Sequence, residues 1–264
     1  MPSPSVTVSV YPTGEAVMNL ARAFINDSFR GGAGRILTDA ASFTIPYLNS
    51  AQRKLQDYLA VNGVSSFVKD NYKMLNIPAV VEADASVQCT IDWQGYFNGT
   101  QMYKNPILPQ DMLVPLDLRE RQTGSGQQFK PMKTPQDGLP SRKQTGVFGV
   151  WEWRNDKIAL IGATMNRDLQ LRYEARLPLI NTGANLSEAK IMIRDSTDAL
   201  AWQVAYLFAN ARGSQQAPML AANFDSQAAY IVTRYSRRDQ RIQYRRKSFA
   251  RQRGVIGLGS YAGG

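Results

Sequence analysis

Ser66 and Lys69 are the first residues whose types and spacing could do chemistry, because S-x-x-K is the pattern of a serine nucleophile with a lysine partner. The run from Ser66 to Leu75 is predicted to be a strand, in which residues three apart point to opposite faces. The companion motifs S-D-N and K-T-G do not occur in the sequence. We therefore expect no serine acyl-enzyme here.

A glycine-rich segment, Arg30 to Arg35, could suggest a loop that cradles phosphate. It lacks the G-K-[ST] ending of a P-loop, and it follows a predicted helix rather than a strand. We interpret the segment as a loop between helices and expect no bound cofactor.

Histidine is missing from all 264 residues, and Cys89 is the single cysteine. This composition excludes Ser-His-Asp and Cys-His nucleophiles, histidine-ligated metal sites, cysteine-rich zinc sites and a disulfide within the chain. The acids Glu82, Asp84 and Asp92 lie close in sequence but lack the spacing of a metal-binding loop. We expect neither a metal site nor an enzyme.

Positive charge is concentrated near one end of the chain. There are 31 Lys and Arg residues against 21 Asp and Glu, which gives a net charge of +10. Between Arg234 and Arg253, nine basic residues and one acid contribute +8 of that total. Eight of the nine are arginines, which favours paired hydrogen bonds to carboxylates or phosphates. The rest of the chain is close to neutral.

The basic stretch has helical spacing. If the preceding helix continues, one face carries five arginines: Arg234, Arg237, Arg238, Arg241 and Arg245. A thin apolar seam recurs every seven residues, at Tyr235, Ile242 and Phe249. The segment has too little apolar surface to fold alone. It is therefore either a solvated tail or a segment that becomes ordered on an acidic protein or a nucleic acid.

Four aromatic residues gather in a short stretch: Trp93, Tyr96, Phe97 and Tyr103. Exposed aromatics of this kind could contact a partner protein or stack on bases. Isolated aromatics are usually packing residues, which favours the core of a β-rich domain together with one bulky loop. Both interpretations remain open on the sequence.

Helices are expected at both ends of the chain. Thr13 is a suitable N-cap for a helix with an apolar face from Val17 to Phe24. A second helix is predicted from Thr38-Asp39, past Pro46, to a stop at Asn62-Gly63.

Two further helices are predicted after the middle of the chain. The first begins at a capping residue, Asp195, Ser196 or Thr197, and ends at Arg212-Gly213. The second begins near Gln215 or Pro218 and leads into the arginine-rich stretch.

Short β-like runs separated by Pro, Gly and Asn occupy the middle of the chain, which predicts a small barrel or sandwich. Asn155-Asp156 is expected to be the turn of a hairpin. The candidate strands are 66–75, 87–93, 113–121, 128–132, 148–154, 157–161 and 168–176.

These elements predict an α+β protein in which both ends of the chain form a helical bundle and a small antiparallel β domain is inserted between them. The expected divisions are an extended arm over 1–12, a helical domain over 13–63 and 190–233, a β-rich insert over 64–180, and a basic tail over 234–264.

The arm has no basic region followed by an apolar run, as a signal peptide would, and Val6, Val8 and Val10 alternate with polar residues as in a strand. No apolar stretch approaches the roughly 18 residues of a membrane span. We expect a soluble protein made in a reducing compartment, without a membrane partner.

The chain resembles the head-to-tail connector, or adaptor, proteins of tailed bacteriophages over most of residues 13–253. The motifs that carry the resemblance are structural rather than catalytic. They are Leu37-Thr38-Asp39, Pro46-Tyr47-Leu48-Asn49, Ala51-Gln52-Arg53-Lys54-Leu55-Gln56, Leu59, Gly63, Leu108-Pro109-Gln110-Asp111-Met112-Leu113, Leu116-Asp117-Leu118-Arg119-Glu120-Arg121, Gly149-Val150-Trp151-Glu152-Trp153-Arg154 and Arg245-Arg246-Lys247-Ser248-Phe249.

The resemblance implies a structural protein of the virion neck, made in the host cytoplasm. It implies a ring, dodecameric in such adaptors, that docks beneath the portal protein, binds further tail or nozzle proteins below, and lets genome DNA pass through its lumen during ejection. We expect the arm before Pro12, the aromatic stretch over 92–105 and the glycine-rich end to be particular to this chain.

By position, the segment that reaches the portal would be 234–264. The expected portal-binding residues are Arg234, Tyr235, Arg237, Arg238, Arg241, Ile242, Arg245, Arg246 and Phe249. The expected contacts with tail-side partners are Trp93, Tyr96, Phe97 and Tyr103. The alternative is a nucleic-acid-binding protein that uses the arginine stripe on phosphates.

Overall fold

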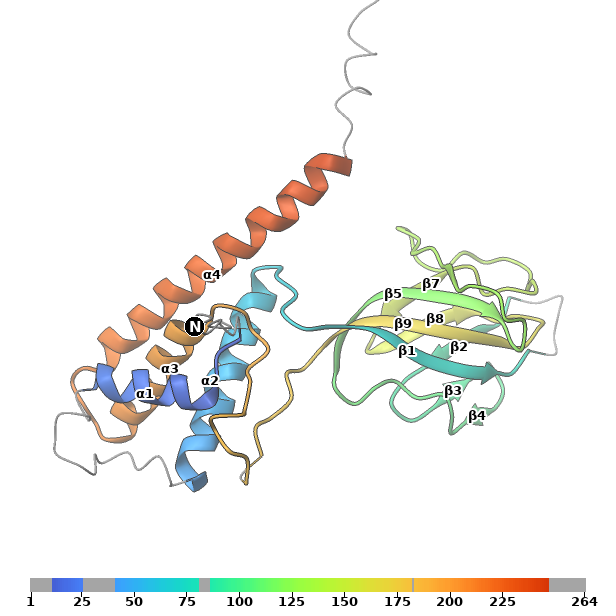
Figure 1. Ribbon diagram of the computed structural model, residues 1–264. Coiled ribbons are helices and arrows are strands. Elements are labelled where there is room, and N and C mark those ends of the chain that lie inside the picture. The colour runs from blue at the N-terminus through green and yellow to red at the C-terminus, as the bar shows by residue number, and fades with distance from the viewer. Residues whose placement is uncertain (1–10, 26–40, 81–85, 182, 247–264) are drawn as a thin grey trace, which may run out of the picture. The chain divides into compact units, whose positions relative to one another are not determined.

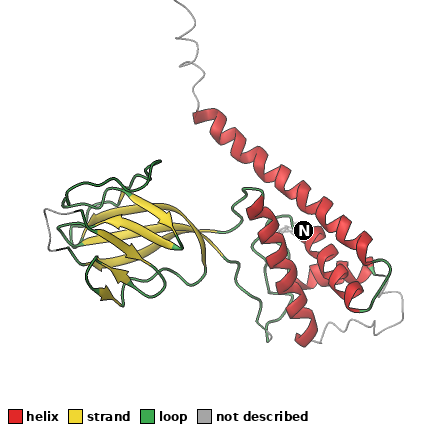
Figure 2. Ribbon diagram, turned by 180° about the vertical axis from the view of Figure 1, so that it is seen from behind, coloured by secondary structure: helices red, strands yellow, loops and turns green. Residues whose placement is uncertain are grey.

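The computed structural model describes residues 11–25, 41–80, 86–181 and 183–246, with the backbone alone for 41–43 and 236–246. The chain forms two compact units, one drawn from 1–64 and 179–264 and the other from 65–178. All the helices belong to the first unit and all the named strands to the second (Figure 2). The predicted α+β class is confirmed.

The first unit contains four helices in its described part (Figure 1). They are α1 (Gly14–Phe24), α2 (Ala41–Val61), α3 (Thr197–Ala211) and α4 (Ala217–Arg246). Helix α3 lies against each of the other three. Half of its buried residues are alanines, which allow its neighbours to approach closely.

Helix α1 starts as its sequence predicts. The Thr13 hydroxyl accepts a hydrogen bond from the Ala16 N–H at 3.2 Å, which satisfies one of the free donors at the helix start. Val17, Met18 and Ala21 are buried at helical spacing. The N-cap and the apolar face together account for the position of this helix.

Helix α2 also ends where its sequence predicts. Gly63 has a φ of +72°, and its N–H donates to the Ala60 carbonyl at 2.9 Å. The Val64 N–H donates to the Leu59 carbonyl at 2.9 Å, which completes a Schellman motif. The start predicted at Thr38-Asp39 lies outside the described residues.

Helix α3 begins at Thr197, but its expected side-chain cap is absent. The Ser196 hydroxyl donates to the Ile193 carbonyl at 2.8 Å instead of accepting from the helix. Asp195 has a φ of +58°. The prediction of a capping side chain at this helix is therefore wrong, because a local turn over Ile193–Ser196 uses the hydroxyl.

The segment that returns from the second unit is tied to the helices by backbone pairing. The Gly14 N–H donates to the Ala189 carbonyl at 2.8 Å, and the Ile191 N–H donates to the Pro12 carbonyl at 2.9 Å. Ile180 pairs with the side chain of Asn49 on α2. The helical unit is thus built from both ends of the chain.

The second unit contains two antiparallel sheets within its described residues, ordered β1-β9-β5-β6 and β4-β3-β2-β8-β7 (Figure 1). The strands are β1 (Val68–Ile77), β2 (Gln88–Ile91), β3 (Tyr96–Phe97), β4 (Met102–Tyr103), β5 (Met112–Gln122), β6 (Lys130–Pro131), β7 (Trp151–Arg154), β8 (Lys157–Ile161) and β9 (Arg167–Ala175).

The hairpin between β7 and β8 is confirmed. Arg154 pairs with Lys157, and the two turn residues, Asn155 and Asp156, have φ values of +50° and +58°. Positive φ at both central positions is the geometry of a tight hairpin turn, and Asn and Asp tolerate it better than most residues.

Within the described residues the two sheets do not close into a barrel. The sequence predicted either a barrel or a sandwich, and the barrel alternative is therefore wrong. A single bridge, Lys133 to Val150, links the segments beside β6 and β7. The other edges of the two sheets are β1 and β4, which are not paired with each other. Strand β4 has only two residues. Such a short edge strand offers too few backbone groups for closure.

One hydrophobic core joins the inner faces of both sheets. Leu118, Leu169 and Leu171 come from the first sheet and are fully buried. Ile91 and Ile158 face them from the second sheet and are equally buried. Strand alternation therefore divides each sheet into an inner apolar face and an outer face that meets solvent.

Candidate partner-binding surfaces

Helix α4 is the longest element of the chain, with 30 residues. Its packed face repeats at helical spacing through Phe224, Ala228 and Ile231, which are buried. From Val232 to Arg246 the helical backbone continues for about 22 Å. Figure 1 shows α4 running well past the ends of the other helices of its unit.

The prediction that the last helix continues into the arginine-rich stretch is thus confirmed as far as Arg246. Tyr235 is half-buried. The side chains of Arg237, Arg238, Arg241, Ile242, Arg245 and Arg246, and Phe249 as a whole, lie outside the described residues.

Arg234, the first arginine of the stripe, is paired within its own unit. Its Nη1 lies 3.0 Å from Oδ2 of Asp195, in the loop before α3. The Nε of Arg194 lies 3.7 Å from the same oxygen. One carboxylate thus faces two guanidinium groups, and local sequence spacing gave no signal for this pairing.

The four predicted aromatic contacts do not form one cluster. Tyr96 is fully buried and stacks on Tyr103 with ring centroids 5.9 Å apart. Burial raises the pKa of the Tyr96 hydroxyl, and the neighbouring Cys89 adds to the effect. For Tyr96 the partner-contact prediction is corrected, because strand alternation turns this side chain into the core.

Phe97 lies on the opposite, outer face of the same strand and is 37% exposed. It pairs in register with Met102 on β4, which is 45% exposed. The sequence analysis did not single out Met102, although a tight β3–β4 hairpin places it opposite Phe97. Across the sheet this outer row continues through Thr90, Ala159 and Glu152.

Trp93 projects from the turn after β2 and is 40% exposed. Its Nε1 donates to the Pro109 carbonyl at 3.2 Å, and its ring meets Trp153 edge-on with centroids 6.2 Å apart. One edge of the ring is therefore fixed by the fold while the rest meets solvent, as is typical of aromatic anchors at interfaces.

Asp92 holds the turn that presents Trp93. Its Oδ1 accepts from the backbone N–H groups of Gln94 and Gly95 at 2.8 and 3.0 Å, and its Oδ2 pairs with Lys157 at 3.1 Å. Burial raises the pKa of Asp92, but these partners outweigh it and leave the pKa below its usual value. Glu82 and Asp84 lie outside the described residues.

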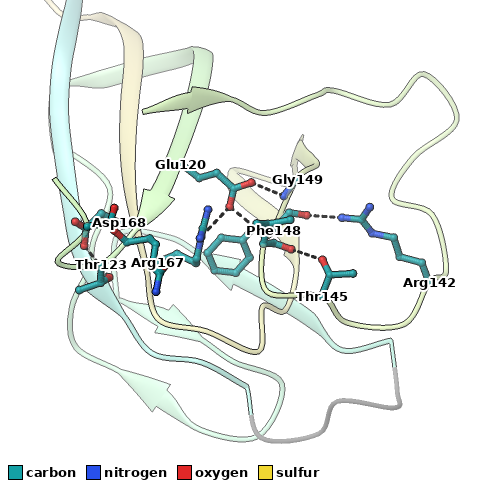
Figure 3. A network of polar contacts seen from close by, with 11 residues as sticks. Glu120, Thr123, Arg142, Thr145, Phe148, Gly149, Arg167 and Asp168 are labelled. Carbon is teal, nitrogen blue, oxygen red and sulfur yellow. Dashed lines mark hydrogen bonds and ion pairs between the residues drawn. The ribbon is translucent and has the colours of Figure 1, made fainter. Parts of the chain in front are cut away.

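A buried ion pair joins β5 to the start of β9 (Figure 3). The Oε2 of Glu120 accepts from the Arg167 Nε at 3.2 Å and from the Phe148 N–H at 3.0 Å. The other oxygen accepts from the Gly149 N–H at 2.8 Å. Both carboxylate oxygens are thus satisfied, and the loop before β7 is fixed to β5.

The same loop is held by two further contacts, from Arg142 Nη2 to the Phe148 carbonyl at 2.6 Å and from the Thr145 hydroxyl to the Val147 carbonyl at 2.9 Å (Figure 3). These groups bind one another across the loop. The network is therefore a structural feature of the β unit.

A second carboxylate, Asp168, joins three segments of the first sheet. It accepts hydrogen bonds from the Asn76 N–H, the Thr123 hydroxyl and the Arg121 Nε at 2.9 to 3.0 Å. Burial raises the pKa of Asp168, whereas these three donors lower it by more, so the pKa lies below its usual value.

Lys69, the lysine of the S-x-x-K pattern, forms an ion pair with Asp111. The other oxygen of Asp111 accepts from the Tyr173 hydroxyl at 3.0 Å. Burial raises the pKa of Asp111, but the Lys69 and Tyr173 contacts outweigh it and lower the pKa. Lys69 thus serves to link β1 to the start of β5.

In the part of the chain that the structure describes, no group of three or more Cys, Asp or Glu side chains could hold a metal ion. No described helix has the length and apolar character needed to span a membrane. No protein-family model matches the chain. No curated protein sequence matches it either.

Proposed function

We propose that the chain is a head-to-tail adaptor of a tailed bacteriophage. It is a structural virion protein that forms a ring between portal and tail, with a central channel for genome DNA. The helical unit is the bundle that builds the ring, the β unit is a sandwich that meets tail components, and the basic segment docks on the portal.

The observation that carries the proposal is the extension of α4. Its first half packs on the helical unit, and its second half carries the arginine-rich stretch as a continuous helical backbone. A segment that is already helical loses less conformational entropy on binding than a disordered one. Arginines at helical spacing can then make paired hydrogen bonds to carboxylates on an acidic protein surface.

The β unit offers a second set of contacts at its surface. Trp93, Phe97 and Met102 remain between 37% and 45% exposed although they are apolar. Aromatic residues and methionine are enriched at protein interfaces. We assign them to contacts with downstream tail or nozzle proteins, in line with the resemblance of the sequence to adaptors.

Native mass spectrometry of the full chain, alone and mixed with a candidate portal protein, tests the proposal. We expect a monomer alone and a ring in the presence of the portal. The variant R237Q/R238Q/R241Q/R245Q should lose portal attachment and retain the fold. A matched control neutralises four exposed bases elsewhere, R53Q/K54Q/K73Q/K104Q, and should still attach. Normal attachment by the first variant would contradict the proposal.

The nucleic-acid alternative makes a different prediction for the same proteins. The isolated monomer would bind DNA tightly, with log affinity falling against log salt at a slope of about −0.9 for each phosphate neutralised. The four-arginine variant would lose most of that slope. Weak binding that vanishes at physiological salt, together with portal attachment, supports the adaptor.

A further inference from the structure

Two Asn-Gly dipeptides occur in the sequence, Asn62-Gly63 and Asn98-Gly99. Asparagine followed by glycine is the pair most prone to form a cyclic succinimide, because glycine has no side chain to hinder ring closure. The fold treats the two dipeptides differently.

Asn62 lies at the exposed C-terminus of α2. Its Nδ2 donates to the Tyr58 carbonyl at 2.8 Å, and the Gly63 N–H donates to the Ala60 carbonyl at 2.9 Å. Apart from Gly63 itself and its chain neighbours, no residue comes within 4 Å of the position that a Cβ on Gly63 would take. The terminal turn of a helix frays, so both hydrogen bonds open without disturbing packed side chains.

Asn98 lies in a far more constrained turn and is 7% exposed. Its Oδ1 accepts from the Thr100 N–H at 3.1 Å, the Thr100 hydroxyl at 3.1 Å and the Gln101 N–H at 2.8 Å. A Cβ on Gly99 would collide with the side chain of Val87. Rotating this peptide toward the side chain would break three hydrogen bonds and disturb that packing.

We propose that Asn62 is a site of spontaneous modification to aspartate and isoaspartate, and that the fold protects Asn98. The Gly63 nitrogen loses its proton to hydroxide and attacks Cγ of Asn62. A bond forms between this nitrogen and Cγ, the bond from Cγ to Nδ2 breaks, and Nδ2 takes a proton from water and leaves as ammonia. Water then opens either carbonyl of the succinimide, which gives aspartate or isoaspartate at position 62.

Either product weakens the end of α2. A carboxylate cannot donate to the Tyr58 carbonyl, and it adds negative charge at the negative end of the helix dipole. Isoaspartate also lengthens the main chain before Gly63, which displaces the hydrogen bond from Val64 to Leu59. Val64 is 3% exposed and is the last residue of the first unit before the chain enters the second.

The test ages the full-length protein at mildly alkaline pH and follows both dipeptides by peptide mapping, with isoaspartyl methyltransferase labelling to detect isoaspartate. In the folded chain we expect modification at Asn62 to exceed that at Asn98 at least several-fold. In denaturant the two rates should converge, because the protection of Asn98 comes from the fold.

The variant Asn62→Gln keeps an amide donor for the Tyr58 carbonyl but disfavours ring closure, so it should remove the signal at this position. Equal rates at the two dipeptides in the folded chain, or an unreactive Asn62, would overturn the proposal. Because both dipeptides are read in the same wild-type molecules, the comparison does not depend on the folding of any variant.

Discussion

The side-chain amide of Asn49 on α2 exchanges two hydrogen bonds with the backbone of Ile180, from which it is separated by 131 residues. The Nδ2 donates to the Ile180 carbonyl at 2.9 Å, and Oδ1 accepts from the Ile180 N–H at 2.9 Å. Ile180 is itself buried. One amide therefore satisfies both polar groups of a buried residue where the chain rejoins the helical unit.

Replacing Asn49 with Ala should destabilise the protein by about 1 to 3 kcal/mol, because both backbone groups of Ile180 would be buried without partners. Urea denaturation followed by circular dichroism measures the free energy of unfolding. Asn19→Ala on the exposed side of α1 is the matched control and should change it by less than about 0.5 kcal/mol. Similar losses of unfolding free energy in the two variants would show that the Asn49 hydrogen bonds do not stabilise the protein.

The ion pair between Glu120 and Arg167 should be far more sensitive than a pair at the surface. Both side chains are less than a tenth exposed. Glu120→Gln leaves the Arg167 charge buried without its carboxylate, and we expect a loss of about 3 to 5 kcal/mol. Arg119→Gln breaks the exposed pair with Asp117 and should cost about 1 kcal/mol or less. Denaturant titration measures the free energy of unfolding of the two variants. Equal losses in Glu120→Gln and Arg119→Gln would contradict this explanation.

Local sequence patterns predicted those parts of the fold that local chemistry determines. Thr13 caps α1, Gly63 stops α2, and Asn155-Asp156 turns the β7–β8 hairpin, because each feature depends on neighbours within a few residues. The pairing of Asn49 with Ile180 depends on tertiary structure and has no periodic signal.

The candidate surfaces also contain some residues that local patterns predict and others that depend on tertiary contacts. Alternation along β3 separates Tyr96 from Phe97, but only the register of β3 and β4 adds Met102 to the exposed row. The sequence placed Arg234 in a continuous stripe, whereas the turn before α3 brings Asp195 to it. In both cases the missing information was a contact between segments.

The stability of the protein should be constant between about pH 5 and pH 8, because the chain has no histidine to titrate in that range. Three carboxylates, Asp92, Asp111 and Asp168, have pKa values below the usual one, so they bind protons more weakly in the folded chain than in the unfolded chain. Their contribution is complete above the unfolded pKa of about 3.9 and is lost as the pH falls through the lower folded values.

Thermal unfolding between pH 7 and pH 2 tests this prediction. The melting temperature should fall only below about pH 4. Asp168→Asn should lower the melting temperature at neutral pH. It should also make the fall of the melting temperature below about pH 4 smaller, since that carboxylate no longer titrates. A decline that begins near pH 6 would contradict the assignment.

The outer face of the β unit can be altered without loss of its core. Phe97→Ser and Met102→Ser should each cost about 1 kcal/mol or less, because both side chains are substantially exposed. Tyr96→Ala, on the inner face of the same strand, should cost about 3 to 5 kcal/mol. If the outer face binds tail components, the serine variants will lose that binding while their melting temperature stays close to that of the wild type.

If the basic stretch docks on a portal as proposed, the pairing of Arg234 with Asp195 predicts that its arginines contribute unequally to that docking. Both partners are more than a third exposed, so the pair itself adds only about 0 to 1 kcal/mol to stability. A portal carboxylate must nevertheless displace Asp195 to reach Arg234. Arg234→Gln should therefore weaken portal binding less than Arg241→Gln does, and Asp195→Asn should strengthen it.

Titration of the portal with these three variants at fixed salt measures the affinities, and a repeat at higher salt should reduce the differences. Asp225, an exposed acid on α4, supplies the control. Asp225→Asn makes the same charge change as Asp195→Asn without releasing Arg234. If both asparagine variants strengthen binding equally, general charge rather than the release of Arg234 explains the gain.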